Sequence, residues 1–251
     1  MSASFYLSQL IPLLQKIQDT QMENIHAAAE AFAKSIAAGR AVHMFGSGHS
    51  VMPVLDIFPR YGAYVGFHPI MDPRLMWSNI TGPGGAQELL WLEREEGYVR
   101  NILLSHDLDA RDCMLVFSHG GLNAAPVEMA LAGKEKGMTV VVVTSVDNRK
   151  YNRPVHSSGK SLHDIGDVVI DNCSPMDDAL VQIEGLPGKV AASSTVTGIA
   201  VAQALVAETT DILRQLGKLP ERVFVSPNVT SVPKDNNRRV FEDYNKFIKG
   251  L

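Results

Sequence analysis

Two segments of this 251-residue chain place glycine, serine and histidine directly after a short apolar run. They are Val42–Ser50 (VHMFGSGHS) and Met114–Asn123 (MLVFSHGGLN). Glycine lets the backbone turn tightly and approach a ligand, and the N–H groups that open a following helix attract negative charge. Serine hydroxyls add further hydrogen-bond donors. Each segment therefore predicts an anion site, and two in one chain predict it more strongly than either alone.

Histidines and glutamates near these turns have the chemistry of proton transfer. His49 lies in the first turn and His119 in the second, so both can reach one pocket, and histidine titrates near neutral pH. For His119 we expect a binding role, in which it donates a hydrogen bond to the ligand rather than transferring a proton. Glu93, Glu95 and Glu96 lie in Leu92–Tyr98. Helical spacing puts Glu93 and Glu96 on one face but not Glu95, and each is also compatible with a solvated helix end.

Alternating apolar runs and helix-compatible stretches surround the two turns. Such runs are typical of strands covered on both faces, and the alternation predicts an α/β fold with a doubly wound parallel sheet. Ligands of such sheets bind at the carboxyl ends of the strands, where both turns fall. The predicted strands are 41–46, 63–67, 114–118, 139–145 and 168–171, and the predicted helices are 51–60, 85–105, 124–136 and 190–215.

The two ends of the chain differ from this central pattern. Residues 4–38 have apolar side chains at helical spacing, as one long helix or two, and Gly39 is a suitable stop. Residues 146–162 and 172–189 are expected to be polar loops. We divide the chain into an N-terminal helical extension (1–39) that packs on the core or a partner subunit, a ligand-binding domain (40–218) and an irregular tail (219–251) with a short helix near 236–248.

Composition excludes several classes of protein. The formal net charge is −4 and the charges are mixed, which argues against a nucleic-acid binder. Cys113 and Cys173 have no metal-type spacing, and no apolar run approaches the ~20 residues needed to span a bilayer. We therefore expect a cytoplasmic protein with no membrane, no nucleic acid and no metal.

These motifs, with Val140–Ser145 and Ser193-Ser194-Thr195 opening a helix, resemble the sugar isomerase (SIS) domain over roughly residues 40–215. Within that group the chain is most similar to stand-alone phosphosugar isomerases. The resemblance implies a five-stranded parallel sheet flanked by helices, assembly as a homodimer or homotetramer, and a phosphosugar at the strand tips. It implies that the phosphate and sugar are bound by Ser47, Gly48, Ser50, Ser118, His119, Gly120, Gly121, Asn123, Ser193, Ser194 and Thr195.

The sequence departs from the family pattern in three places. Gly120 stands where a second serine is expected in the second turn, and Asn123 replaces a threonine. Asn123 can still donate a hydrogen bond, and Gly120 can offer its N–H. Lys189 occupies the position where related enzymes have a glutamate before the Ser-Ser-Thr helix, so Glu184 is a further candidate base. Ser193, Ser194 and Thr195 are also compatible with a purely local helix cap.

The resemblance implies an aldose–ketose isomerase for a sugar phosphate. His49 would act with one of Glu93, Glu95 and Glu96, or with Glu184, in acid–base proton transfer. No metal or organic cofactor would be needed, since placed donors can stabilise an enediol. Two alternatives stay open: a lyase similar to N-acetylmuramate-6-phosphate etherases, and a non-catalytic sugar-phosphate sensor. A buried carboxylate with a raised pKa in the pocket would favour an enzyme over a sensor.

Overall fold

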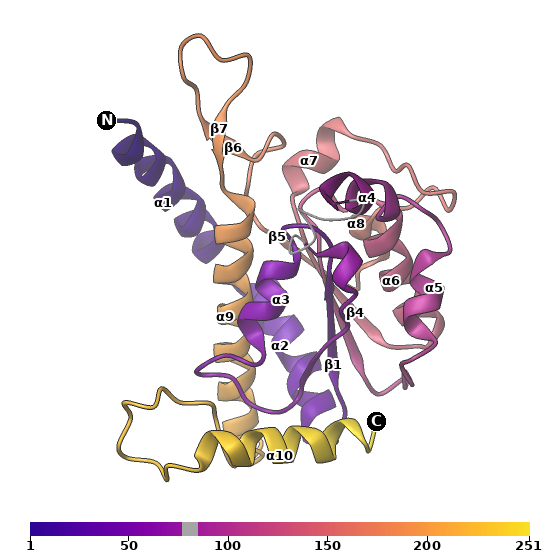
Figure 1. The fold of residues 1–251 in the computed structure, drawn as a ribbon, viewed down its shortest axis with the longest axis vertical. Coiled ribbons are helices and arrows are strands. Elements are labelled where there is room, and N and C mark those ends of the chain that lie inside the picture. The colour runs from indigo at the N-terminus through magenta and orange to yellow at the C-terminus, as the bar shows by residue number, and fades with distance from the viewer. Residues whose placement is uncertain (77–84) are drawn as a thin grey trace.

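The computed structural model describes residues 1–76 and 85–251, and Trp77–Gly84 lie outside the described residues. A five-stranded parallel sheet forms its centre, in the order β2-β1-β3-β4-β5 (Figure 1). The strands are β1 (Val42–Gly46), β2 (Phe67–Pro69), β3 (Cys113–Phe117), β4 (Thr139–Thr144) and β5 (Val168–Asp171). After β1 the chain forms β2 on one side of β1 and then crosses to form β3 on its other side. The direction in which strands are added to the sheet therefore reverses between β1 and β3. This is the position where open α/β sheets bind ligands.

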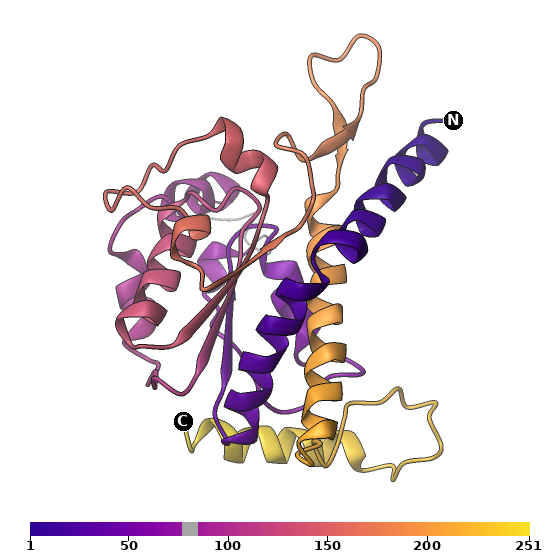
Figure 2. The same cartoon turned by 180° about the vertical axis from the view of Figure 1, so that it is seen from behind.

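Helices cover both faces of the sheet (Figures 1 and 2). One face carries α2 (Met22–Ala37), α3 (Val51–Ile57) and α9 (Ser194–Gln215), and the other carries α5 (Tyr98–Leu103), α6 (Ala124–Glu135) and α8 (Leu162–Ile165). Two hydrophobic cores lie on the two faces of the sheet, and side chains along each strand point to them alternately. Met44 and Leu115 pack into the core under α2, α3 and α9, while Phe45 and Val116 pack into the core under α5, α6 and α8. The predicted doubly wound parallel sheet with flanking helices is thus confirmed.

The predicted elements differ from the observed ones at several boundaries. Ala63 and Tyr64 are buried, but Ala63 O accepts from Phe224 N at 2.8 Å rather than from a neighbouring strand, and β2 begins only at Phe67. Helix α3 ends at Ile57 because Phe58, which precedes a proline, is extended. The predicted helix 85–105 is two helices, α4 (Gly85–Leu92) and α5, separated at Gly97, whose φ is 89°.

The segments expected to be loops contain short elements. Helix α7 (Val146–Tyr151) and the start of α8 fall within 146–162, and η1 (Pro73–Leu75) follows β2. The strand β6 (Ala179–Val181) pairs antiparallel with β7 (Val190–Ala192), which occupies the start of the stretch predicted as a helix. Helix α9 therefore begins at Ser194.

The N-terminal segment forms two helices, α1 (Ser2–Thr20) and α2, which meet at Gln21. Helix α1 and the β6–β7 hairpin extend together beyond the body of the molecule (Figure 2), and Tyr6 donates its hydroxyl hydrogen to Ala192 O at 2.8 Å. Helix α1 leaves Phe5, Leu7 and Ile11 exposed.

The tail is irregular until α10 (Asn236–Ile248), which crosses the sheet end opposite the two glycine turns (Figure 1). Val240 of α10 and Phe32 of α2 lie in the same core as strand residues. Our division of the chain into three parts stays a prediction, and these contacts show that the terminal parts share a core with the sheet.

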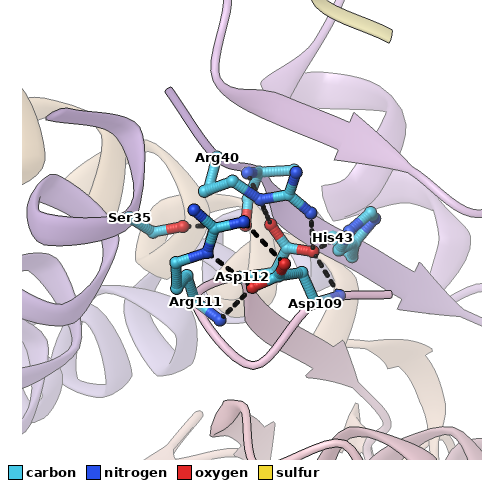
Figure 3. Close-up of polar contacts among 7 residues, drawn as sticks. Ser35, Arg40, His43, Asp109, Arg111 and Asp112 are labelled. Carbon is cyan, nitrogen blue, oxygen red and sulfur yellow. Dashed lines mark hydrogen bonds and ion pairs between the residues drawn. The ribbon is translucent and has the colours of Figure 1, made fainter. Parts of the chain in front are cut away.

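A buried ion-pair cluster lies where β1 and β3 begin (Figure 3). The Asp112 carboxylate accepts hydrogen bonds from Arg40 Nε and Nη2, both at 2.9 Å, from Ala41 N at 3.0 Å and from His43 Nε2 at 3.2 Å. Asp109 N also donates to it at 2.9 Å. Burial acts to raise the pKa of Asp112, but the hydrogen bonds from His43 and Arg40 outweigh it and lower that pKa to about 2. The cluster joins the neighbouring strands β1 and β3 at their amino ends, opposite the glycine turns.

Within the described residues, one helix is long and apolar enough to cross a membrane by length and composition, namely α9. Half of its most apolar window is buried, as in the core helix of a folded domain.

Candidate functional site

The first glycine turn, Ser47–Ser50, connects β1 to α3 and has a fixed backbone. A Cβ added at Gly46 would lie 2.1 Å from Ser50 O, so only glycine fits before the turn. Gly48 has a φ of 58°, and its N–H donates to Leu75 O at 2.7 Å. This N–H, which we expected to help bind phosphate, is therefore already used to attach the turn to η1.

Glu93 lies directly after α4 and faces the first turn. Ser47 Oγ donates to Glu93 Oε2 at 2.9 Å, and the Asn123 side chain also hydrogen-bonds to this carboxylate. Glu93 is only 7% exposed. Burial raises the pKa of Glu93 above its ordinary value of 4.5, while the Ser47 bond, the charge of Arg94 and the Asn123 bond act in the opposite direction. A buried carboxylate with a raised pKa is suited to acid–base catalysis near neutral pH.

The second glycine turn, Ser118–Asn123, connects β3 to α6. Gly121 has a φ of 64°, and its N–H donates to Ser118 Oγ at 3.1 Å, so this predicted phosphate donor is also occupied. The N–H groups of Gly120, Leu122 and Asn123 donate to no acceptor among the described residues. Asn123 stands at the N-cap of α6 without a side-chain cap bond. Free N–H groups in a turn that leads into a helix favour an anion.

The two histidines of the turns lie close together. His49 Nδ1 is 3.1 Å from Thr195 Oγ1, and burial lowers the pKa of His49, with Asp178 opposing this effect and His119 adding to it. His49 is thus uncharged near neutral pH. His119 Nε2 is 3.3 Å from Met176 O, which can only accept, so Nε2 carries the hydrogen, and Nδ1 faces the Asn172 amide at 3.5 Å.

These residues enclose a cavity of about 260 Å³ between the two turns, which we call the site cavity. The usual range for small-molecule sites is roughly 300–1,000 Å³, so this volume suits a small ligand. A narrow extension of about 10 Å³ shares His49, Ser50, Ser118 and His119 with it and reaches Ser194 and Thr195. The site cavity is lined by Ser47, Gly48, His49, Ser50, Leu89, Leu90, Glu93, Ser118, His119, Gly120, Gly121, Leu122 and Asn123.

A carboxylate of the chain itself occupies the N-terminus of α9. Asp178 Oδ1 accepts from Ser193 N at 3.0 Å and Ser194 N at 2.6 Å, and Asp178 Oδ2 accepts from Ser194 Oγ at 2.8 Å. Ser193 Oγ donates to Asp178 O at 2.8 Å. Burial acts to raise the pKa of Asp178, but the Ser194 hydrogen bonds lower it overall, so this group is an anion. The hydroxyls of Ser193 and Ser194, expected to hold phosphate, instead hold Asp178.

The structure therefore brings together most, but not all, of the predicted site residues. Glu95 is half-buried and does not line the site cavity. Glu184 is exposed in the β6–β7 connection, which projects away from the sheet (Figure 1). Ser193 is buried behind Ser194 and Thr195. Of the candidate bases, only Glu93 lines the site cavity.

Sequence reasoning missed Asp178 and the apolar wall formed by Leu89, Leu90 and Leu122. Asp178 lies far from Ser194 in the sequence, and its φ of 62° is a property of the folded backbone. Nothing in the sequence distinguishes the three leucines from core residues. Within the described residues, no group of three histidine, cysteine or acidic side chains is arranged to hold a metal ion.

The two adjacent glycines of the second turn are expected to respond differently to substitution. A Cβ at Gly120 would meet only Asn148 at 4.0 Å, whereas one at Gly121 would lie 2.7 Å from Thr144 Oγ1 at a positive φ. Gly120→Ser should therefore melt like wild type and bind phosphate at least as tightly. Gly121→Ser should lose about 1–3 kcal/mol of stability from backbone strain and overpacking. Thermal melts of both variants, with and without inorganic phosphate, check this expectation, and equal melting temperatures would contradict it.

Known proteins similar to this chain point to one family. The SIS domain model matches residues 5–145. A UPF0309 protein of Thermoanaerobacter pseudethanolicus is 33% identical over 250 residues, covering 98% of each chain. A UPF0309 protein of Listeria innocua is 32% identical over 243 residues, covering 97% of this chain and 96% of its own.

A solved structure shares the fold at lower sequence identity. The phosphoheptose isomerase GmhA from Neisseria gonorrhoeae superposes with a TM-score of 0.55 at 15% identity, covering 82% of this chain and 96% of its own. This likeness concerns the arrangement of the sheet and helices.

Proposed function

Because the chain belongs to the SIS domain family, we propose that it binds a phosphorylated sugar in the site cavity and interconverts its aldose and ketose forms. The observation that carries this proposal is the Glu93 carboxylate, buried against Ser47 and Asn123 in a cavity between two glycine turns. Its raised pKa supports an enzyme over a non-catalytic sensor.

The phosphate is assigned to the second turn. The N–H groups of Gly120, Leu122 and Asn123 lie in the turn that ends at the N-cap of α6, and among the described residues they have no acceptor. Ser50 and Ser118 line the same cavity and can donate hydroxyl hydrogens. The α9 N-terminus is not part of this phosphate site, because Asp178 already occupies it. Thr195 instead orients His49.

Proton transfer is assigned to Glu93 and His49. In its ionised form, Glu93 takes the proton from C2 of the open-chain aldose while the carbonyl oxygen O1 gains a proton, which gives the enediol. Glu93 then delivers a proton to C1 while the O2 hydroxyl loses its own, which gives the ketose. His49, uncharged near neutral pH, moves the proton between ring oxygen and hydroxyl during ring opening. Ser47 and Asn123 hold the carboxylate in place and favour its ionised form. No metal or organic cofactor is part of this proposal.

Assembly and location stay predictions. The exposed apolar side chains of α1 are a surface that would support a homodimer or homotetramer. The mixed surface charge and net charge of −4 support a cytoplasmic small-molecule enzyme over a nucleic-acid binder.

A thermal-shift screen tests the binding step. Sugar phosphates of four to seven carbons, amino-sugar phosphates and their unphosphorylated parents are compared. A ligand at a hundred times its Kd stabilises the fold by about 2.7 kcal/mol, which moves the melt measurably. We expect a phosphorylated sugar to shift the melt and its parent sugar not to. If no phosphorylated compound shifts the melt, the proposed function is wrong.

A further inference from the structure

A loop far along the chain is attached to the segment that carries Glu93. This segment, residues 93–97, connects α4 to α5, and Glu96 lies near its end. Ser157 N donates to Glu96 Oε1 at 2.7 Å, and Ser157 Oγ donates to Glu96 Oε2. These hydrogen bonds lower the pKa of Glu96, which therefore accepts them as a carboxylate. The connection after α4 is thus bonded to the loop that follows α7.

His156 extends the same contact into the protein. Its side chain is 7% exposed, and its Nε2 lies 3.6 Å from Glu96 Oε2 and 3.7 Å from Glu128 Oε1. Ser158 N donates to His156 Nδ1 at 3.1 Å, so Nδ1 is an acceptor and the ring hydrogen is on Nε2. That hydrogen faces two carboxylates. The ring therefore lies between Glu96 and Glu128 rather than pointing to solvent, and its buried Nε2 makes no hydrogen bond to the described residues.

Glu128 attaches the segment from the other side. Located on α6, it accepts from Gly97 N at 2.5 Å and from Val99 N at 3.4 Å. Ala125 N, also on α6, donates to Glu93 O at 3.0 Å. Both ends of residues 93–97 are consequently bonded to neighbouring elements, one end to α6 and the other to α6 and the 156–158 loop.

We propose that Glu96, Glu128, His156 and Ser157 form a clasp that positions the Glu93 carboxylate in the site cavity. None of the four lines that cavity, so they act through Glu93 and are positioning residues. The expected effect of the clasp on turnover rests on the proposed function. Its expected effect on the position and pKa of the Glu93 carboxylate does not. A general base must lie within hydrogen-bond reach of the proton it removes, so a loosened connection lowers turnover more than binding.

The test compares Glu96→Ala with Glu135→Ala, an exposed glutamate on α6 without a side-chain hydrogen bond to the described residues. Two readouts are taken: kcat and KM for the sugar phosphate that shifts the melt, and the Glu93 pKa by carbon-13 carboxyl NMR. In E96A we expect kcat to fall about 10–100-fold with KM nearly unchanged. We also expect the Glu93 pKa to move down toward 4.5, because water reaches the carboxylate. E135A should match wild type in both readouts.

Conservative variants separate positioning from a general loss of structure. Glu96→Gln keeps an acceptor oxygen for Ser157 and should recover most of the kcat. Ser157→Thr keeps the hydroxyl and should behave better than Ser157→Ala. A lower melting temperature in E96A with wild-type kcat and wild-type Glu93 pKa would overturn the proposal, as would an equal change in E135A. If the wild type turns over no sugar phosphate, the proposed function is wrong. The Glu93 pKa measured by NMR in E96A and E135A still tests whether the clasp positions Glu93.

Discussion

Replacing Glu93 with glutamine is expected to lower kcat for the sugar-phosphate substrate by about 10²–10⁴-fold, the usual contribution of general acid–base catalysis. Glutamine keeps the shape of the side chain and an oxygen that can accept from Ser47 Oγ, so the Kd of the sugar phosphate should change little. Turnover is measured by NMR of the sugar anomeric signals, and Kd by the thermal shift. Glu135→Gln, on the exposed face of α6, is the matched control.

The same substitution has a signature in stability that does not depend on turnover. Because the folded pKa of Glu93 is raised above 4.5, the unfolded chain loses its proton at a lower pH than the folded one. Wild-type stability therefore decreases as the pH rises from 4.5 through the folded pKa, and E93Q escapes this loss. We expect E93Q to melt higher than wild type at neutral pH and equally at pH 4 or below. An E93Q protein with wild-type kcat, or with a lower melt at neutral pH, would contradict the role given to Glu93.

The second large effect is a loss of stability, and we expect it from Asp112→Asn at the amino ends of the strands. The Asp112 side chain is fully buried, and Arg40 beside it is 7% exposed, so the substitution leaves a buried cation without its partner. Breaking a buried ion pair in this way costs about 3–5 kcal/mol. For a domain of this size, each kcal/mol lowers Tm by about 2–4 °C, so D112N should melt roughly 10 °C below wild type. Calorimetry at pH 7 measures the difference.

The role of Asp112 can be checked in two ways: by the dependence of stability on acid pH, and by a control substitution at the neighbouring Asp109. Its pKa is lowered to about 2 from 3.8, so its stabilising effect is complete above pH 3.8 and is lost as the pH falls toward 2. The difference between wild type and D112N should shrink over that interval. Asp109→Asn should lower the melting temperature much less, because Asp109 pairs with the exposed Arg111 at the surface, where water screens the ion pair. Equal losses in D109N and D112N would refute this account of the cluster.

Much of the fold could be predicted because its signals are local. Strands such as Val42–Gly46 and Cys113–Phe117 are continuous apolar runs, as strands covered on both faces must be. The glycine turns that follow β1 and β3 identify the carboxyl edge of the sheet. The stretch from residue 63 was misassigned as a strand because burial against Phe224 gives the same apolar pattern as burial in a sheet.

The site was predictable in its turns but not in its long-range partners. The sequence leaves the base open among several glutamates, and only the fold places Glu93 against Ser47. Asp178 reaches Ser194 across the β6–β7 hairpin, and Ser157 reaches Glu96 from another loop. Such contacts depend on where the elements pack, which no local pattern in one sequence records.

Incubation of the protein with phosphorylated aldoses in D₂O, followed by proton NMR, tests the central claim most directly. The proton that Glu93 holds between the two transfers exchanges with D₂O. One phosphorylated aldose should therefore give a ketose with deuterium at C1, and the recovered aldose should carry deuterium at C2. Glu93→Gln should bind the same compound without exchange. A phosphorylated sugar that binds but shows neither exchange nor ketose with the wild-type protein would contradict the account.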